Sequence, residues 1–180
     1  THERLALATD LADVILAIRT IEVPDEAAND PTLRGYRGRS LSEFDKQTRN
    51  NIRKCRSIND LDLDLDAALE VWSNALDIPG ADKVDPDRWY HSDLVAENLL
   101  LTGDRLTAVL DFGGLAIGDP TIDLLGAWEV LDGPAREAFR TRLGVDDAEW
   151  LRGRAWALAI ALVTFPYYWA TMPSRRMDRL

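Results

Sequence analysis

The sequence is poor in the residues that hold small or metal-stabilised domains together. It contains one cysteine, Cys55, and three lysines among 180 residues. A lone cysteine excludes a disulfide framework and a cysteine-based zinc site, so we expect Cys55 to be a small, partly buried apolar side chain. The chain is 46% hydrophobic and carries six tryptophans. It is therefore long and apolar enough to bury a core without such staples.

Positive charge is also scarce. The 21 Lys and Arg residues are outnumbered by 31 Asp and Glu residues, which gives a formal net charge of −10. Basic residues gather only around positions 53–56 and 175–176, so a nucleic-acid partner is not expected. The acidic surface favours solubility, or the steering of a cationic ligand.

The sequence shows no targeting segment and no clear membrane span. Residues 1–10 lack the basic region and the apolar run of a secretory signal. Residues 155–174 carry no charge, but five alanines and two prolines leave only residues 155–165 strongly apolar. We therefore expect a buried core helix that ends near Pro166, in a cytoplasmic protein without a membrane partner.

Hydrophobic periodicity and capping residues predict a mostly helical chain. Apolar residues recur at helical spacing from residue 5 to residue 18. Ser40 and Glu43 form the pattern of a capping box, and Asp146 and Glu149 form another capping pattern. Asp64 or Asp66 is the expected N-cap of the helix that ends at residue 76, and prolines at 120 and 134 mark further helix starts. The expected helices cover residues 5–18, 40–58, 64–76, 121–131, 134–143 and 147–165.

One β-hairpin is expected near the middle of the chain. Residues 99–101 and 106–110 are short apolar runs, and Thr102-Gly-Asp-Arg105 between them is typical of a turn. The expected fold class is therefore α+β, mostly α-helical, with this hairpin as its β component.

Polar side chains flank the hairpin. Asp93 precedes it, Asn98 enters its first strand and Asp111 follows its second strand. Because the turn reverses the chain, these three residues are expected at one end of the ribbon. An amide oxygen and a carboxylate are hard ligands that suit Mg²⁺ held jointly with nucleotide phosphates. A carboxylate that binds no metal can accept a proton from a substrate hydroxyl, and the two functions together are what phosphoryl transfer requires.

The order of these motifs is more informative than any one of them. A lone Asp-Phe-Gly often only ends a strand. His-x-Asp, then Asn five residues after the Asp, then Asp-Phe-Gly across a hairpin is a pattern of kinase catalytic loops. Over residues 91–101, 111–113 and 118–123 the sequence resembles the aminoglycoside phosphotransferase family. That family shares the protein-kinase-like fold and also contains macrolide, choline and homoserine kinases.

The resemblance implies a role for each matching residue. Asp93 matches the catalytic base, and Asn98 and Asp111 match the residues that hold Mg²⁺. Leu100 and Leu110 match positions that lie against the nucleotide, which is ATP or GTP.

Other residues of the motif support or modify the expected site. His91 is expected to have a hydrogen-bonding, structural role, and Asp123 matches a buried carboxylate that bonds backbone amides of the catalytic loop. Asp119, in a Gly-Asp-Pro turn, is expected to be a structural cap. The family usually has glycine or a small residue where this chain has Ser92 and Glu97. Glycine often supplies a positive φ, so Ser92 is expected to affect the loop geometry.

A complete member of that family also has an N-terminal lobe, with a phosphate-covering loop and a lysine paired to a glutamate. Lys46, Lys54 and Lys83 do not stand in strand contexts, and no Gly-rich loop lies between expected strands. We therefore expect residues 1–180 to form a C-terminal lobe that is catalytic and substrate-binding, with the nucleotide-binding lobe absent from this chain.

The acceptor is the least determined part of the hypothesis. The leading interpretation is a kinase lobe that moves the γ-phosphoryl of ATP or GTP to a hydroxyl of an aminoglycoside-like antibiotic, a resistance function. Two alternatives stay open, a kinase of a macrolide or another metabolite and a truncated, non-catalytic binding module. Trp128, Glu129 and Asp132 are the candidates for contact with an acceptor.

Overall fold

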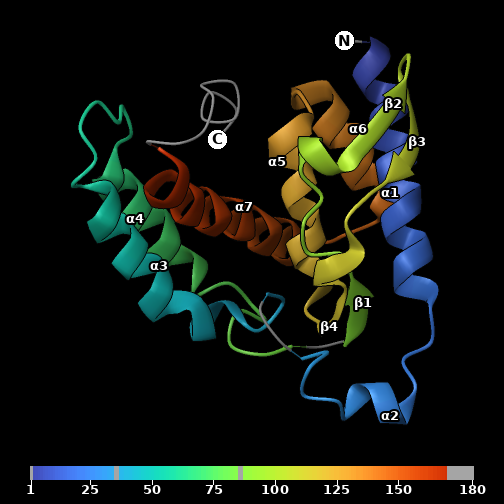
Figure 1. Cartoon of the computed structure of the whole chain (residues 1–180), viewed down its shortest axis with the longest axis horizontal. Helices are drawn as coiled ribbons and strands as arrows, with labels where there is room; N and C mark the ends of the chain where they lie inside the picture. Colours follow the sequence, from blue (N-terminus) through green and yellow to red (C-terminus); the bar gives the residue numbers. More distant parts are fainter. Residues whose placement is uncertain (1, 35–36, 85–86, 170–180) are drawn as a thin grey trace.

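Helices form most of the residues that the computed structural model describes, which are 2–34, 37–84 and 87–169. Figure 1 shows their arrangement. The α-helices are α1 (His2–Thr20), α2 (Asp25–Ala28), α3 (Leu41–Cys55), α4 (Leu65–Ala75), α5 (Gly126–Val130), α6 (Gly133–Leu143) and α7 (Asp147–Tyr168). Three short 3₁₀ helices accompany them, η1 (Ala96–Asn98), η2 (Phe112–Gly114) and η3 (Pro120–Leu125).

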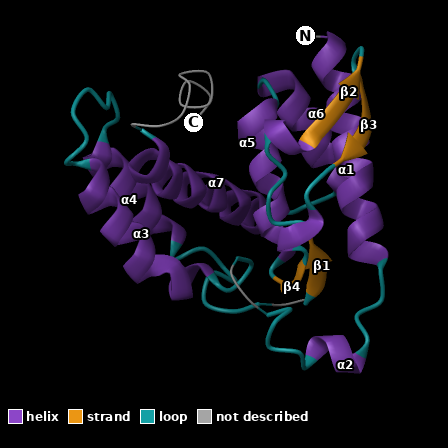
Figure 2. Ribbon diagram, in the orientation of Figure 1, coloured by secondary structure: helices purple, strands orange, loops and turns teal. Residues whose placement is uncertain are grey.

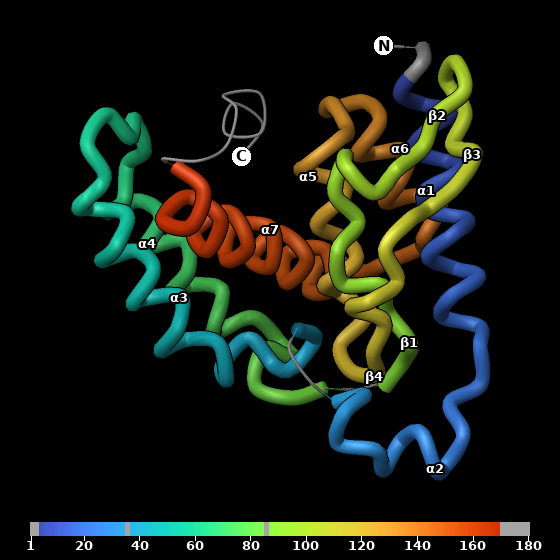
Figure 3. The backbone as a smooth tube through the Cα atoms, viewed as in Figure 1, coloured from blue at the N-terminus to red at the C-terminus, as the bar shows by residue number. Residues whose placement is uncertain are grey.

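The long helix α7 joins two groups of elements (Figures 1 and 3). On one side α3 and α4 form an antiparallel pair that packs against it. On the other side α1 packs against α6 and the hairpin, while η3 packs on α7 itself. The segment containing α2 carries the chain from the second group, which contains α1, to the first group, which contains α3. The hairpin and the polar residues that flank it therefore lie on one side of α7, and the α3–α4 pair lies on the other.

Apolar side chains fill both sides of this arrangement. Leu11 and Ile15 of α1 meet Phe139 of α6 in one buried cluster, as the periodicity of residues 5–18 predicts. Trp72 of α4 and Trp156 of α7 lie in a second cluster, and both are fully buried. Side chains of α7 belong to the second cluster and to a third cluster near the C-terminal end of α7. This helix therefore connects two of the apolar clusters.

Side-chain caps set several helix starts where the sequence predicts them. Ser40 and Glu43 form a capping box at α3, and Asp146 and Glu149 form one at α7. Asp64 caps α4, accepting hydrogen bonds from the amides of residues 66 and 67 at 3.1 and 2.9 Å. These caps satisfy amides that have no partner within their own helix.

The end of α7 differs from the prediction. The helix continues past Pro166 to Tyr168, because a proline in the last turn removes only one helical hydrogen bond. The carbonyl that would have accepted that bond belongs to Leu162, and the Cys55 thiol donates to it at 3.7 Å. The buried Cys55 thus packs as a small apolar residue with a weak donor. No helix in the described part of the chain, α7 included, is long and apolar enough to cross a membrane.

Two small antiparallel sheets position the polar residues in the segment from His91 to Asp111 (Figure 2). The predicted hairpin pairs β2 (Leu99–Thr102) with β3 (Arg105–Val109). A second pair, β1 (Arg88–Tyr90) with β4 (Ala116–Gly118), was not predicted, since each strand has three residues and no alternating pattern. It joins the segment before His91 to the segment before η3. The segments that precede and follow residues 91–115 are therefore held side by side by this pairing.

The helix predicted over residues 121–131 is also more complex than expected. It begins at Pro120 as η3 and becomes α-helical only at Gly126, as α5. Asp119 caps η3 by accepting from the Thr121 amide at 2.9 Å. This arrangement places Asp123 inside η3 and directs it towards the loop after β1.

Candidate active site

The buried carboxylate of Asp123 fixes the start of the loop that follows β1. Asp123 has no exposed surface, and its Oδ2 accepts from the His91 amide at 2.9 Å while Oδ1 accepts from the Ser92 amide at 2.7 Å. Burial raises the pKa of this carboxyl, and the two amide bonds oppose that shift. The loop is thereby held through its backbone, independently of most of its side chains.

His91 connects this loop to the strand that leads out of the hairpin. Its Nε2 donates to the carbonyl of Leu110 at 3.0 Å, and its Nδ1 accepts from the Asp93 amide at 3.3 Å. The ring is fully buried and stands edge-on to Phe112, with 4.7 Å between ring centroids. Because both ring nitrogens are engaged with the backbone, His91 is placed to support the site rather than to contact a ligand.

Ser92 adopts a left-handed backbone conformation, as expected for a position where the family that the sequence resembles usually has glycine. Its φ is 75°, and the Ser92 hydroxyl donates to the Gly114 carbonyl at 3.0 Å. A Cβ atom at Gly114 would lie 2.3 Å from the Ser92 hydroxyl, so only glycine at 114 leaves room for this side chain. The contact between Ser92 and Gly114 therefore accompanies a positive φ at Ser92, a backbone conformation that serine disfavours.

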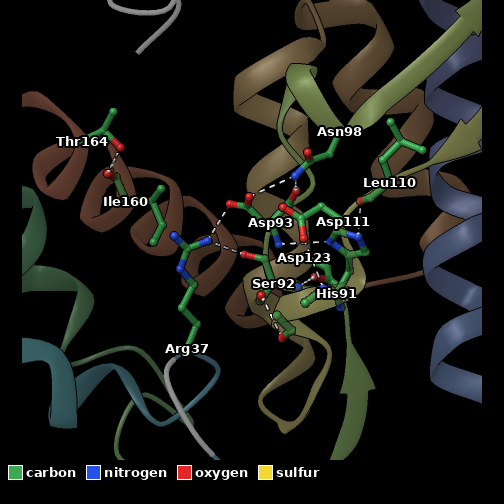
Figure 4. Close-up of polar contacts among 12 residues, drawn as sticks. Arg37, His91, Ser92, Asp93, Asn98, Leu110, Asp111, Asp123, Ile160 and Thr164 are labelled. Atoms are coloured by element: carbon green, nitrogen blue, oxygen red, sulfur yellow. Dashed lines mark hydrogen bonds and ion pairs between the residues drawn. The ribbon is translucent and has the colours of Figure 1, made fainter. Parts of the chain in front are cut away.

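Asp93 is held from two directions (Figure 4). Its Oδ1 accepts from Arg37 Nη1 at 2.6 Å, and its Oδ2 accepts from Asn98 Nδ2 at 3.0 Å. Asn98 Nδ2 also donates to the Asp93 carbonyl at 2.9 Å, and Arg37 Nη1 donates to the Ser92 carbonyl at 2.9 Å. The Asp93 side chain is 31% exposed, so it is oriented by its neighbours yet reachable by a ligand.

Arg37 is the residue of this site that the sequence did not reveal. It lies before α3, 56 positions away from Asp93, and reaches it across the chain from the α2–α3 connection. No local pattern around Arg37 indicates such a contact. The signal that could have found it is charge balance, because the loop from His91 to Asn98 has two carboxylates and no cation of its own apart from a histidine.

The hairpin brings Asn98 and Asp111 together. The Leu110 amide donates to the Asn98 carbonyl at 2.8 Å, which places Asp111 beside Asn98. Asp111 has a left-handed backbone, with φ 58° and ψ 66°, and its Oδ1 accepts from the Gly113 amide at 3.3 Å. Asn98 Oδ1 and Asp111 Oδ2 accept no hydrogen bond from the described residues.

These two open oxygens have the chemistry of a shared magnesium site. Mg²⁺ typically takes one or two protein oxygens and completes its shell with water and substrate phosphates. Within residues 2–34, 37–84 and 87–169 there is no group of three or more His, Cys, Asp or Glu side chains that could enclose a metal. The donor set therefore fits a metal that arrives with a phosphorylated ligand.

The candidates for nucleotide contact lie on the surface of the hairpin region. Leu100 is 47% exposed and Leu110 is 42% exposed, with Phe112 and Leu101 exposed nearby in the chain. Leu100 and Leu110 are close in sequence to Asn98 and Asp111, respectively. They are available to a flat apolar group, although the backbone of Leu110 is already used by His91.

The three residues predicted to contact an acceptor have two different environments in the structure. Trp128 and Glu129 both line two cavities, of about 500 and 510 Å³. Trp128 is fixed against Trp150, with 4.6 Å between ring centroids. Asp132 lines neither cavity, and its Oδ1 caps α6 by accepting from the Ala135 amide at 3.1 Å.

A helical lobe with a catalytic-type loop, a hairpin and an Asp-Phe-Gly turn defines a kinase-like phosphotransferase fold. The sequence matches the profile described as the phosphotransferase enzyme family, abbreviated APH, over residues 1–156. The chain therefore belongs to this phosphotransferase family. A search of curated proteins finds no matching sequence.

Solved structures of phosphotransferases share the fold. The gentamicin complex of APH(2'')-IIa has a TM-score of 0.62 at 19% identity, covering 99% of this chain and 60% of that protein. The GDP complex of aminoglycoside 2'-phosphotransferase-IIIa has a TM-score of 0.65 at 16% identity, covering 97% and 58%.

Macrolide 2'-phosphotransferase MphH from Brachybacterium faecium is similar to the same extent. Its apoenzyme has a TM-score of 0.61 at 20% identity, with coverage of 97% of this chain and 57% of that protein. The chain thus spans somewhat more than half the length of each of these structures. At these identities the likeness concerns the fold, which aminoglycoside and macrolide phosphotransferases have in common.

Proposed function

We propose that this chain is the catalytic lobe of a small-molecule kinase that transfers the γ-phosphoryl of ATP or GTP to a hydroxyl group. The observation that carries the proposal is the convergence of Asp93, Asn98 and Asp111 at one end of the hairpin, on a loop held by Asp123. A carboxylate and two further hard oxygen donors in this arrangement match the needs of phosphoryl transfer.

Asp93 acts on the acceptor in this mechanism. Arg37 and Asn98 each hold one of its oxygens, and each carboxylate oxygen retains a second lone pair for the incoming hydroxyl. Asp93 orients that hydroxyl and accepts its proton as the acceptor oxygen bonds to the γ-phosphorus. The bond between the γ-phosphorus and the bridging oxygen breaks, and the nucleoside diphosphate leaves.

Asn98 and Asp111 would hold Mg²⁺ through the oxygens that accept no bond from the described residues. A bound Mg²⁺ neutralises charge on the transferring phosphate groups. Leu100 and Leu110 would present their exposed side chains to the nucleotide. The similar structures include complexes with ATP and with GDP, which supports nucleotide binding here without selecting the base.

The aminoglycoside-like acceptor of the sequence hypothesis and a macrolide acceptor are both compatible with this fold. Both classes appear among the similar structures. Because these two acceptor classes share the fold, side chains rather than the fold distinguish them.

We further propose that a nucleotide-binding lobe outside these 180 residues completes the enzyme. The described strands contain none of the three lysines, since Lys46 and Lys54 lie on α3 and Lys83 lies in a turn. The test compares residues 1–180 alone with the same chain joined to such a lobe. We expect a cooperative melt in both, but acceptor-dependent release of nucleoside diphosphate only from the joined protein. Absence of release from the joined protein with any aminoglycoside, macrolide or other hydroxyl acceptor would contradict the proposed function.

A further inference from the structure

The backbone of Arg37 is bonded to the two strands that pair beside the loop after β1. The hydroxyl of Tyr90, the last residue of β1, donates to the Arg37 carbonyl. The amide of Asp119, which follows β4, donates to the Gly38 carbonyl at 2.6 Å. Since β1 and β4 pair with each other, residues 37 and 38 are fixed to the ends of one small sheet.

Two glycines allow the chain to come this close to the sheet. Gly38 has a φ of 74°, a conformation that glycine adopts without strain. A Cβ atom at Gly38 would overlap the ring of Tyr90, and a Cβ atom at Gly118 would overlap the Gly38 carbonyl. The ring of Tyr90 and the end of β4 therefore lie directly against the main chain of Gly38.

Tyr90 is suited to hold the Arg37 backbone in one position. It is fully buried, and burial raises the pKa of its hydroxyl, which therefore stays protonated and remains a donor at neutral pH. A buried hydroxyl that loses its acceptor is unfavourable, as is a buried carbonyl that loses its donor. The bond between Tyr90 and Arg37 is therefore expected to persist in solution.

The contacts between residues 37–38 and the loop after β1 run in both directions. Tyr90 holds the Arg37 carbonyl, and Arg37 Nη1 donates to the Ser92 carbonyl at 2.9 Å and to Asp93 Oδ1 at 2.6 Å. Figure 4 shows the Arg37 side chain extending from its own segment to Asp93. Because an arginine side chain has many rotamers, a fixed backbone lowers the entropy cost of holding its guanidinium at Asp93.

Resting on the proposed function, we propose that Tyr90 is a positioning residue for phosphoryl transfer. Its hydroxyl fixes the backbone of Arg37, and the Arg37 guanidinium then holds one oxygen of Asp93 while the other faces its bond from Asn98. Tyr90 is buried and acts only through Arg37. Loss of its hydroxyl should therefore slow the transfer step without weakening acceptor binding, since the change concerns the orientation of Asp93.

A double-mutant cycle in the protein joined to its nucleotide lobe tests this role. Tyr90→Phe keeps the ring against Gly38 and removes only the hydroxyl, and we expect its kcat to fall about 3–10-fold with the acceptor KM unchanged. The double variant with Arg37→Ala should have the kcat of Arg37→Ala alone, because Tyr90 acts through Arg37. A wild-type kcat for Tyr90→Phe, or two effects that multiply in the double variant, would overturn the proposal.

Thr164→Val is the matched control for loss of a buried hydroxyl. Thr164 is buried in α7, and its hydroxyl donates to the Ile160 carbonyl at 2.8 Å (Figure 4). Both variants remove one buried hydroxyl that donates to a backbone carbonyl, so both are expected to lower the melting temperature slightly. Only Tyr90→Phe should lower kcat. An equal loss of kcat in Thr164→Val would assign the effect to lowered stability and contradict the positioning role.

Nuclear magnetic resonance of the 180-residue chain tests the same contact without turnover. With isotopically labelled arginine, the guanidinium signals of Arg37 are identified by their absence in Arg37→Ala. We expect their exchange with water to be at least about threefold faster in Tyr90→Phe than in wild type, and unchanged in Thr164→Val. Equal exchange in Tyr90→Phe and wild type would overturn the proposal.

The two measurements separate this proposal from the proposed function. If exchange accelerates as expected but the joined wild-type protein forms no product, the placement of Arg37 by Tyr90 is supported and the kinase function is contradicted. If product forms while Tyr90→Phe changes neither kcat nor exchange, the kinase function stands and the positioning role is wrong. Should Tyr90→Phe not fold, the wild-type chain must still show a slowly exchanging tyrosine hydroxyl proton close to the α-protons of Gly38, and its absence would contradict the proposal.

Discussion

The two groups of elements on either side of α7 are held together in different ways. On the hairpin side, residues 91–123 are held by hydrogen bonds from a buried carboxylate to backbone amides and by His91 between two backbone groups. On the other side, α4 and α7 are held by apolar packing around Trp72 and Trp156. Backbone hydrogen bonds fix positions within narrow limits, whereas apolar packing tolerates substitution as long as volume is kept. We therefore expect the loop after β1 to tolerate substitution less well than the packing of α4 on α7.

The largest effect is expected from removing the anchor of the hairpin side. Asp123→Ala leaves the buried amides of His91 and Ser92 without an acceptor. Each unpaired amide costs about 1–3 kcal/mol, and loss of an unfavourably buried carboxylate offsets part of this, so we expect about 2–4 kcal/mol of destabilisation by denaturant unfolding. Asp123→Asn keeps one acceptor oxygen and should be intermediate. A melting transition of Asp123→Ala equal to that of wild type would contradict the anchoring role.

Metal dependence separates Asn98 and Asp111 from this anchor. Replacing either by Ala removes a hard oxygen donor, so activity at limiting Mg²⁺ should fall about 100-fold and recover partly at high Mg²⁺. Asp111 is exposed, so its replacement should leave the melting temperature nearly unchanged. Asp104→Ala, at the opposite end of the hairpin, is the control and should keep the normal Mg²⁺ requirement. Identical effects of Asp111→Ala and Asp123→Ala on metal dependence and melting would remove the distinction between the two roles.

Substitution of Arg37 tests whether the connection between α2 and α3 contributes to catalysis. Arg37→Ala frees one oxygen of Asp93 from its partner, and we expect kcat to fall about 10–100-fold with little change in the KM for the acceptor. Arg37→Lys should recover part of this loss, since a lysine supplies the charge without the guanidinium geometry. Arg39→Ala, which removes an exposed arginine two positions away, serves as the control. A change confined to KM or to melting temperature would mean that Arg37 does not position Asp93.

The smallest effect concerns how α1 holds the hairpin. Asp10 accepts from Arg105 Nε and Nη2 at 2.7 Å each and from the Leu106 amide at 3.0 Å. The Arg105 side chain lowers the pKa of Asp10, so this bond stabilises the fold above the unfolded pKa and is lost as pH falls through the folded one. Asp10→Asn should lower the Tm by a few degrees at neutral pH, and the difference should shrink below about pH 4. A Tm difference that does not depend on pH would contradict this account.

Local sequence patterns predict the hairpin and the helix starts better than they predict pairing between distant segments. The predicted hairpin and the Ser40, Asp64 and Asp146 caps are present, because turns and caps depend on residues close together in the chain. The pairing of β1 with β4 was missed because three-residue strands far apart in sequence leave no local pattern.

The contacts between distant segments could not be predicted in the same way. Arg37 reaches Asp93 across 56 positions, and only the folded chain brings them together. Of the three predicted acceptor contacts, Trp128 and Glu129 line cavities, which leaves their predicted role untested, and Asp132 caps a helix. A helix cap and a ligand-binding carboxylate have the same residue type, so sequence alone does not separate them.

In the proposed mechanism, Asp93 receives the acceptor proton during phosphoryl transfer. Its most direct test measures the phosphorylated acceptor by mass spectrometry, for wild type and Asp93→Asn side by side, in the protein joined to its nucleotide lobe. Asparagine keeps the shape of the side chain but accepts no proton, so product formation should fall about 10²–10⁴-fold while the melting temperature changes little. Near-normal product formation by Asp93→Asn would contradict the account.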